Sequence, residues 1–165
     1  MGVSVYNIPM EKDSSRPRPQ ASARNKMMDF LARRDHSEKE LRKKLKSRFT
    51  PEEIEKAIQY GKENGWLPNS PEDTQALSEK TASELRRKGK GTHYINHYLK
   101  EKGLPQVAPD FTEELDKARE LVKNKFSDVN KMDRKDKAKV GRFLASRGFP
   151  MEIVRKVIYE PEDVE

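Results

Sequence analysis

The sequence contains no cysteine and no long apolar segment. Without cysteine the chain can form neither disulfide bonds nor thiolate metal sites, which is typical of proteins in a reducing compartment. No apolar run approaches the roughly 20 residues that are needed to cross a membrane. Residues 1–20 also lack the apolar segment of a secretory signal peptide. We therefore expect a cytoplasmic protein that does not associate with membranes.

Hydrophobic residues are scarce as well. They make up 33% of the 165 residues, and charged residues make up 38%, whereas ordinary globular domains contain about half and about a quarter, respectively. So little apolar material cannot fill one large core. Because the apolar residues recur at helical spacing, the sequence predicts several small helical units, each with a thin core, arranged as an elongated body.

Acidic residues are outnumbered by basic ones. Thirty-five Lys and Arg residues against 28 Asp and Glu residues give a formal net charge of +7 and an isoelectric point near 9.5. This balance favours a polyanion or an acidic protein surface as the partner, and it predicts association that weakens with salt. The net charge does not distinguish between these two kinds of partner.

Helix-start signals divide the chain into units. Ser37 and Thr50 are each followed three residues later by a glutamate, and Ser70 is followed by Asp73, which is the pattern of a capped helix start. We predict a flexible tail over residues 1–21, three-helix repeats over 22–68, 69–112 and 113–160, and an acidic C-terminal end over 161–165. The third helix of the second repeat is expected to be short and to start near Asp110, because two prolines interrupt residues 105–112.

An internal repeat supports this division. Shifting the sequence by 54 residues places Leu41 on Ile95, and a further shift of 45 residues places Ile95 on Val140 and Gly103 on Gly148. Repeats at this spacing are typical of stacked helical modules that bury their apolar faces on one another. The predicted fold class is therefore all-α, an elongated array of three tandem three-helix repeats.

Each repeat carries a motif around its second helix. Residues 36–45 read HSEKELRKKL and match the pattern HS-x-x-EL-x-x-KL, while residues 89–103 match GxG-x-x-x-I-x-x-x-L-x-x-KG. The third repeat closes with Arg-Gly-Phe at 147–149. Over about residues 22–160 this order of motifs resembles the RecX family of regulatory proteins, which are built from tandem three-helix repeats. The chain departs from the family pattern at Phe49, where glycine is common, and in its 20-residue leader.

The resemblance implies a function. Proteins of this family bind the RecA filament that forms on single-stranded DNA, and they inhibit its ATP hydrolysis, strand exchange and coprotease activity. These activities belong to recombination, DNA repair and the SOS response. The resemblance further implies a binding protein and not an enzyme, without cofactor or metal, and we expect it to act as a monomer.

Clusters of basic residues are the candidate partner-binding residues. A cationic stripe that recurs in each repeat is suited to track a phosphate backbone or an acidic filament groove. The alternative is that these residues form solvated helix faces. The candidates are Arg42, Lys43 and Lys46 in the first repeat; Arg86, Arg87, Lys88 and Lys90 in the second; and Lys135, Lys139, Arg142 and Arg147 in the third.

Other patterns have simpler explanations than chemistry. His93 and His97 lie four residues apart but lack a third metal ligand, and Ser37 is better explained as a helix cap than as a nucleophile. The acidic residues between 110 and 120 fit the first turn of a helix, although they are also suited to dock on a basic surface. The rival function is a protein that binds single- or double-stranded DNA directly through helix-turn-helix-like modules.

Overall fold

The structure is a computed structural model, which describes residues 22–126 and 128–160. Within these ranges it contains eight α-helices, one short 3-10 helix and no β-strand, which confirms the predicted all-α class. No helix in the described ranges is long and apolar enough to span a membrane. The predicted tail and the acidic end lie outside the described residues.

The first unit consists of α1 (Ala23–Leu31), α2 (Glu38–Leu45) and α3 (Pro51–Glu63). Ser37 and Thr50 form the predicted capping boxes, in which the serine or threonine and the glutamate three residues later satisfy each other's backbone N–H groups. The helices close around a small core made of Ala23, Met27, Leu41, Leu45, Ile54, Ala57, Ile58 and Leu67.

The second unit has two helices, α4 (Pro71–Arg87) and α5 (Thr92–Lys102). The structure differs here from the sequence-based expectation of a short third helix, because residues 104–110 are not helical. Proline lacks a backbone N–H, so Pro105 and Pro109 disfavour a helix in this segment. The segment instead contributes the buried side chain of Val107, whose backbone exchanges two hydrogen bonds with the side chain of Asn96.

The third unit consists of α6 (Phe111–Lys125), the 3-10 helix η1 (Val129–Lys131), α7 (Arg134–Ser146) and α8 (Met151–Tyr159). The helix that starts next to Asp110 is therefore the first helix of this unit, and it packs against α8. The core comprises Ala118, Val122, Val140, Leu144, Phe149, Ile153, Val154, Val157 and Ile158.

The residues that the internal repeat aligns have the same role in each unit. All six leucine, isoleucine and valine positions of the repeat are 0% exposed: Leu41 and Leu45 in α2, Ile95 and Leu99 in α5, and Val140 and Leu144 in α7. The three helices α2, α5 and α7 are therefore structural equivalents, as the sequence shifts predicted.

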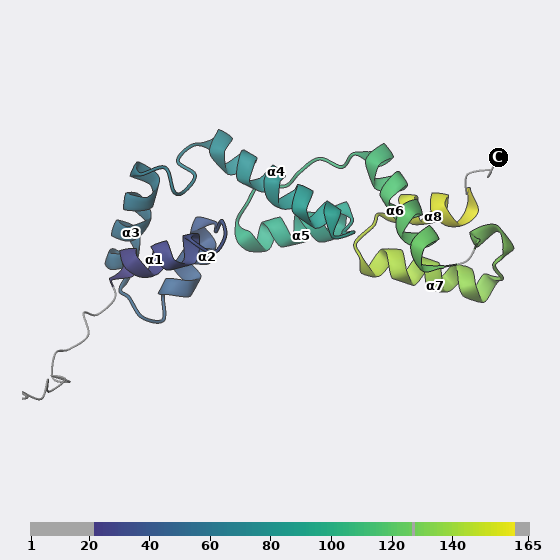
Figure 1. Cartoon of the computed structure of the whole chain (residues 1–165), viewed down its shortest axis with the longest axis horizontal. Helices are drawn as coiled ribbons and strands as arrows, with labels where there is room; N and C mark the ends of the chain where they lie inside the picture. Colours follow the sequence, from purple (N-terminus) through teal and green to yellow (C-terminus); the bar gives the residue numbers. More distant parts are fainter. Residues whose placement is uncertain (1–21, 127, 161–165) are drawn as a thin grey trace, which may run out of the picture.

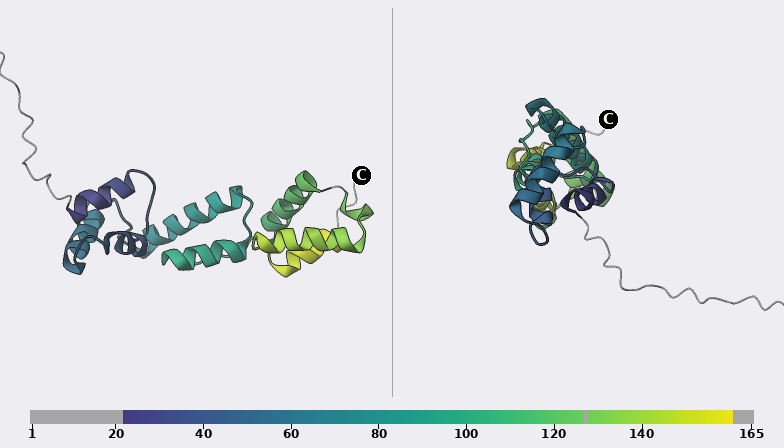
Figure 2. Two further views of the ribbon diagram at one scale, coloured as in Figure 1. Left: turned by 90° about the horizontal axis from the view of Figure 1, so that it is seen from below. Right: turned by 90° about the vertical axis from the view of Figure 1, so that its left-hand side faces the viewer.

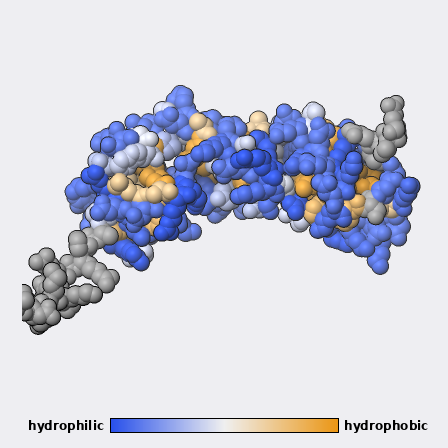
Figure 3. Space-filling model, viewed as in Figure 1, coloured by the Kyte–Doolittle hydropathy of each residue, from blue (hydrophilic) through white to orange (hydrophobic). Residues whose placement is uncertain are grey.

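The three units lie in a row and form an elongated body (Figure 1). A view from below shows α5 in the middle of the row, with one end close to the first unit and the other close to the third (Figure 2). The surface seen in Figure 3 is mostly hydrophilic, with small apolar patches that expose the thin cores. This shape offers a long polar surface to a partner.

Candidate partner-binding surface

The basic residues of the first unit divide into two kinds. Arg42 is tied to its neighbours, because its Nε lies 2.7 Å from Oε1 of Glu55 and its Nη1 lies 3.0 Å from Oε2 of Glu38. The hydrogen bond to Glu55 is the main cause that raises the pKa of Arg42 above its ordinary value. Lys43 and Lys46 are exposed and make no ion pair with any residue that the structure describes. Of the three candidates in this unit, these two lysines can contact a partner without breaking an ion pair within the described residues.

The basic residues of the second unit gather at the turn between α4 and α5. Arg86 and Arg87 lie in the last turn of α4, and Lys88 is its C-cap residue. Lys90 follows in the turn, with its Nζ 4.3 Å from the ring centroid of Tyr94. The group therefore precedes α5 and does not lie on the helix that corresponds to α2 and α7.

Three of the basic residues of the third unit lie on α7. Lys139 is paired with Asp136 at 2.7 Å. Lys135 and Arg142 are exposed, and neither has an ion pair within the described ranges. As in the first unit, part of the predicted set is neutralised locally and part is available.

Arg147 has a different role from the other candidates. It is the C-cap residue of α7, and its Nη1 donates to the carbonyl oxygens of Lys88 and Gly89 at 3.4 and 3.3 Å. The guanidinium also lies 4.7 Å from the ring centroid of Phe143. The side chain therefore joins the second and third units, and one of its terminal nitrogens already donates within the chain.

Backbone hydrogen bonds strengthen this joint. The N–H of Gly91 donates to the carbonyl of Arg147 at 2.9 Å, and the N–H of His93 donates to that of Gly148 at 3.0 Å. A Cβ on Gly91 would lie 2.5 Å from the oxygen of Gly148, and a Cβ on Gly148 would lie 2.4 Å from the nitrogen of Tyr94. Two glycines therefore allow the backbones of the two units to approach this closely.

Glu114 completes the joint between the second and third units. Gly91 is the N-cap residue of α5 and has no side chain to cap the helix. Glu114 of α6 takes over this function: its carboxylate accepts from the N–H of Thr92 at 2.6 Å and from the hydroxyl of Thr92 at 2.9 Å. Sequence reasoning placed Glu114 in a helix first turn, or in an acidic patch suited to dock on a basic surface, and it did not predict this contact. The available signal was the glycine at the start of α5, which leaves the helix in need of an acceptor from elsewhere.

The other end of α5 is fastened to the first unit. The hydroxyl of Ser37 donates to the carbonyl of Lys102, and the ammonium of Lys102 pairs with Glu40. Burial alone would raise the pKa of Glu40, but hydrogen bonds from Arg34 and Lys102 outweigh it and lower the pKa to about 2. Each end of α5 is thus capped by a neighbouring unit, and this arrangement opposes bending of the array at either joint.

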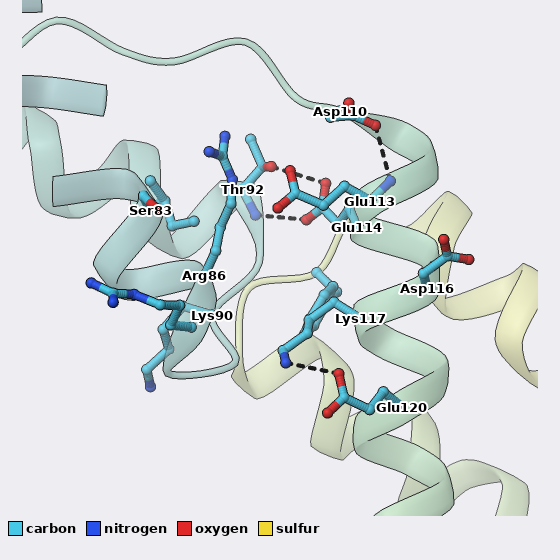
Figure 4. Close-up of a pocket in the computed structure, with 13 residues that line it drawn as sticks. Ser83, Arg86, Lys90, Thr92, Asp110, Glu113, Glu114, Asp116, Lys117 and Glu120 are labelled. Atoms are coloured by element: carbon cyan, nitrogen blue, oxygen red, sulfur yellow. Dashed lines mark hydrogen bonds and ion pairs between the residues drawn. The ribbon is translucent and has the colours of Figure 1, made fainter. Parts of the chain in front are cut away.

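A cleft of about 330 Å³ lies at the joint between the second and third units (Figure 4). One wall is basic and comes from the end of α4 and the following turn, and the other is mainly acidic and comes from α6. Buried residues form its base. The lining comprises Ser83, Arg86, Arg87 and Lys90 on the basic side; Asp110, Glu113, Asp116, Lys117 and Glu120 on the acidic side; and Thr92, Ile95, Glu114 and Phe149 at the base.

No group of three or more His, Asp or Glu side chains within the described ranges is placed to hold a metal ion. His93 and His97, the pair considered from the sequence, are both exposed on α5. The arrangement therefore combines charged surfaces with a charged cleft at the joint between the second and third units. Such a site is suited to binding a macromolecule.

Comparisons with known proteins agree with this architecture. Family models for the first and third three-helix domains of RecX match residues 23–60 and 112–158. Regulatory protein RecX of Cronobacter sakazakii is 34% identical over 160 residues, which cover 84% of this chain and 94% of the relative. The RecX protein of Pseudomonas savastanoi pv. phaseolicola is 32% identical over 146 residues, with 83% and 90% covered.

A solved structure shows the same fold. The crystal structure of a regulatory protein RecX superposes with a TM-score of 0.58 at 22% sequence identity, and the match covers 84% of this chain and 70% of that chain. The helical units are of the same kind and order, and the relatives are similar along most of their length. This chain therefore belongs to the RecX family of regulatory proteins.

Proposed function

We propose that this chain binds the RecA filament on single-stranded DNA and inhibits its ATP hydrolysis, strand exchange and coprotease activity. It would thereby regulate recombination, DNA repair and the SOS response. The observation that carries the proposal is membership of the RecX family over most of the chain. The sequence motifs at 36–45 and 89–103 carry the same family resemblance.

The proposed mechanism is bridging of neighbouring RecA protomers. Three units that are fastened at two joints present separate contacts at fixed spacing, so that several modest contacts act together on a repeating filament. A body that resists bending also opposes the relative movements of protomers that accompany ATP turnover. Residues Ser37 and Glu114, which fasten the two joints, are therefore part of the mechanism although they need not touch the partner.

The contacts are assigned to the candidate basic residues that are at least partly exposed and not already paired within the described ranges. The strongest candidates are therefore Lys43, Lys46, Arg86, Arg87, Lys88, Lys135 and Arg142, of which Arg86 is half-buried and the others are exposed. Arg42, Lys90, Lys139 and Arg147 already have partners or ring contacts within the chain. We assign these four mainly to holding their own helices and turns in place.

The protein would act in the cytoplasm as a monomer, by binding and without a catalytic step. Its contacts with the partner are charged and exposed, and such contacts are typical of reversible association that depends on salt.

Direct DNA binding is the second candidate, because the net charge of +7 suits a polyanion as well as an acidic protein surface. The two functions differ in how binding depends on salt. Binding that rests on six to ten phosphate contacts loses about 10³- to 10⁵-fold in affinity between 50 and 200 mM salt. An interface that is matched in shape to a protein filament is expected to lose much less.

The experiment measures the binding of the fluorescently labelled chain to single-stranded oligonucleotide with and without bound RecA, at 50 and 200 mM salt. We expect tighter binding to the RecA filament than to naked DNA at both salt concentrations. Equal affinity for naked DNA and filament, with a steep loss at 200 mM salt, would instead establish the DNA-binding function.

A further inference from the structure

The cleft between α4 and α6 has charges of both signs on facing walls. Figure 4 shows Arg86 rising from the end of α4, while Glu113, Lys117 and Glu120 extend from α6 toward the same space. A uniformly basic groove would be expected if the cleft followed a phosphate backbone. The acidic wall would repel phosphates, so the cleft is adapted to a different ligand.

The two walls do not neutralise each other. Among the residues that the structure describes, no ion pair joins Arg86, Arg87 or Lys90 to the acidic wall. The ion pair within the cleft, Lys117 to Glu120 at 2.8 Å, joins two residues of α6. Facing charges that remain separate across a cleft can each be satisfied by a ligand that carries the complementary charges.

The base of the cleft is firm and combines two apolar residues with two polar ones. Ile95 is 0% exposed and Phe149 is 4% exposed, so both belong to the cores of their units. Thr92 and Glu114 lie beside them and are already hydrogen-bonded to each other. The volume of about 330 Å³ is at the lower end of the range of about 300–1,000 Å³ that is typical of ligand pockets. It therefore suits a few side chains of a larger partner.

We propose that this cleft receives a segment of the partner protein on which acidic and basic side chains alternate. Carboxylates of the segment face Arg86 and Arg87, cations of the segment face Glu113 and Glu120, and the aliphatic parts of these side chains contact the apolar residues of the base. The inference rests on the proposed function, because the partner that supplies the segment is the RecA filament. It adds a docking point that fixes the position of the array through both signs of charge.

The test compares two variants that each neutralise one wall. The first combines Arg86→Gln with Arg87→Gln, and the second combines Glu113→Gln with Glu120→Gln. Within residues 22–126 and 128–160, none of these side chains forms a hydrogen bond or ion pair except Glu120, which is paired with Lys117 on the surface. Glutamine is also a good helix former. Far-UV circular dichroism and thermal unfolding check that each variant is folded.

Matched controls neutralise exposed charges outside the cleft. Lys123→Gln with Arg155→Gln controls for the loss of two positive charges, and Glu84→Gln with Glu101→Gln controls for the loss of two negative charges. All four residues are exposed and none lines the cleft. The readout is the concentration of the chain that gives half-maximal inhibition of RecA ATP hydrolysis, together with affinity for naked single-stranded DNA.

The proposal predicts that both wall variants raise the half-maximal concentration about tenfold, which corresponds to about 1.4 kcal/mol, while the controls stay within about twofold. The acidic-wall variant must lose inhibition although its affinity for naked DNA stays the same or rises. Equal or better inhibition by the acidic-wall variant, or unchanged inhibition by both variants, would overturn the cleft proposal and leave the proposed function intact. A wild-type chain that fails to inhibit RecA would overturn both.

Discussion

Replacing Glu114 by alanine removes the side chain through which the third unit caps the first turn of α5. In the folded protein this carboxylate accepts hydrogen bonds from the backbone N–H and the hydroxyl of Thr92, at 2.6 and 2.9 Å. Glu114 is 8% exposed and Thr92 is 7% exposed, so water cannot easily replace the missing acceptor. The N-cap residue, Gly91, has no side chain that could take over.

The size of the effect follows from these two contacts. A hydrogen bond to a charged group contributes about 1.5–3 kcal/mol, and a buried donor that is left without an acceptor costs about 1–3 kcal/mol. Because the two bonds share one carboxylate and one residue, their contributions are not independent. We therefore expect Glu114→Ala to lower the free energy of unfolding by about 2–4 kcal/mol. Glu114→Gln, which keeps one acceptor oxygen, is expected to lose about half as much.

The assay combines urea unfolding with amide hydrogen exchange. Exchange should accelerate at the start of α5 and at the N–H groups of Gly91 and His93, which bridge the two units. Glu113→Ala is the matched control, because this neighbouring glutamate is exposed. A loss below about 0.5 kcal/mol for Glu114→Ala, which is the range of ordinary surface substitutions, would refute the role of Glu114 in the joint.

Three further predictions test other parts of the structure. Gly148→Ala should lower the free energy of unfolding by about 2–4 kcal/mol, because the residue has a φ of +82° and its new Cβ would lie 2.4 Å from the nitrogen of Tyr94. Gly65 has a φ of +69° with open space around it, so Gly65→Ala should cost only about 1–2 kcal/mol. Urea unfolding measures both values. The folded-state pKa of Glu40 is about 2, below its ordinary value of 4.5, so Glu40 stabilises the fold above pH 4.5 and this contribution is lost as the pH falls toward 2. Glu40→Gln should therefore flatten the dependence of the unfolding free energy on pH in this window. An unchanged acid dependence of stability would contradict the assignment. Arg42→Gln should change the unfolding free energy by no more than about 1 kcal/mol, because ion pairs of a half-exposed arginine contribute little. A larger loss in thermal unfolding would show that the ion pair with α3 contributes more to stability than its exposure suggests.

Local signals in the sequence predicted much of the fold. Ser37, Thr50 and Ser70 cap helices as expected, because capping depends on residues within three positions of each other. The repeat identified the buried positions of α2, α5 and α7, since helical spacing alone decides which face is apolar. The number of helices in the second unit was not predicted, because the segment around Val107 contributes to the core without forming a helix.

The candidate surface was predicted less completely, since its geometry depends on contacts between units. Runs of basic residues made Lys43 and Arg142 candidates, but they did not separate these two from Arg147, which contacts backbone more than 50 residues away. Glu114 was placed in the first turn of a helix, and its function as a cap for another helix depends on how two units pack. Neither contact has a local signature in the sequence.

The measurement that tests the central claim most directly is RecA ATP hydrolysis on saturating single-stranded DNA at near-physiological salt. The chain is titrated at concentrations well below that of RecA. If it bridges protomers of the filament, as we propose, the rate of hydrolysis will fall at substoichiometric amounts. An unchanged rate under conditions in which the chain clearly binds naked DNA would contradict the proposed function and support direct DNA binding.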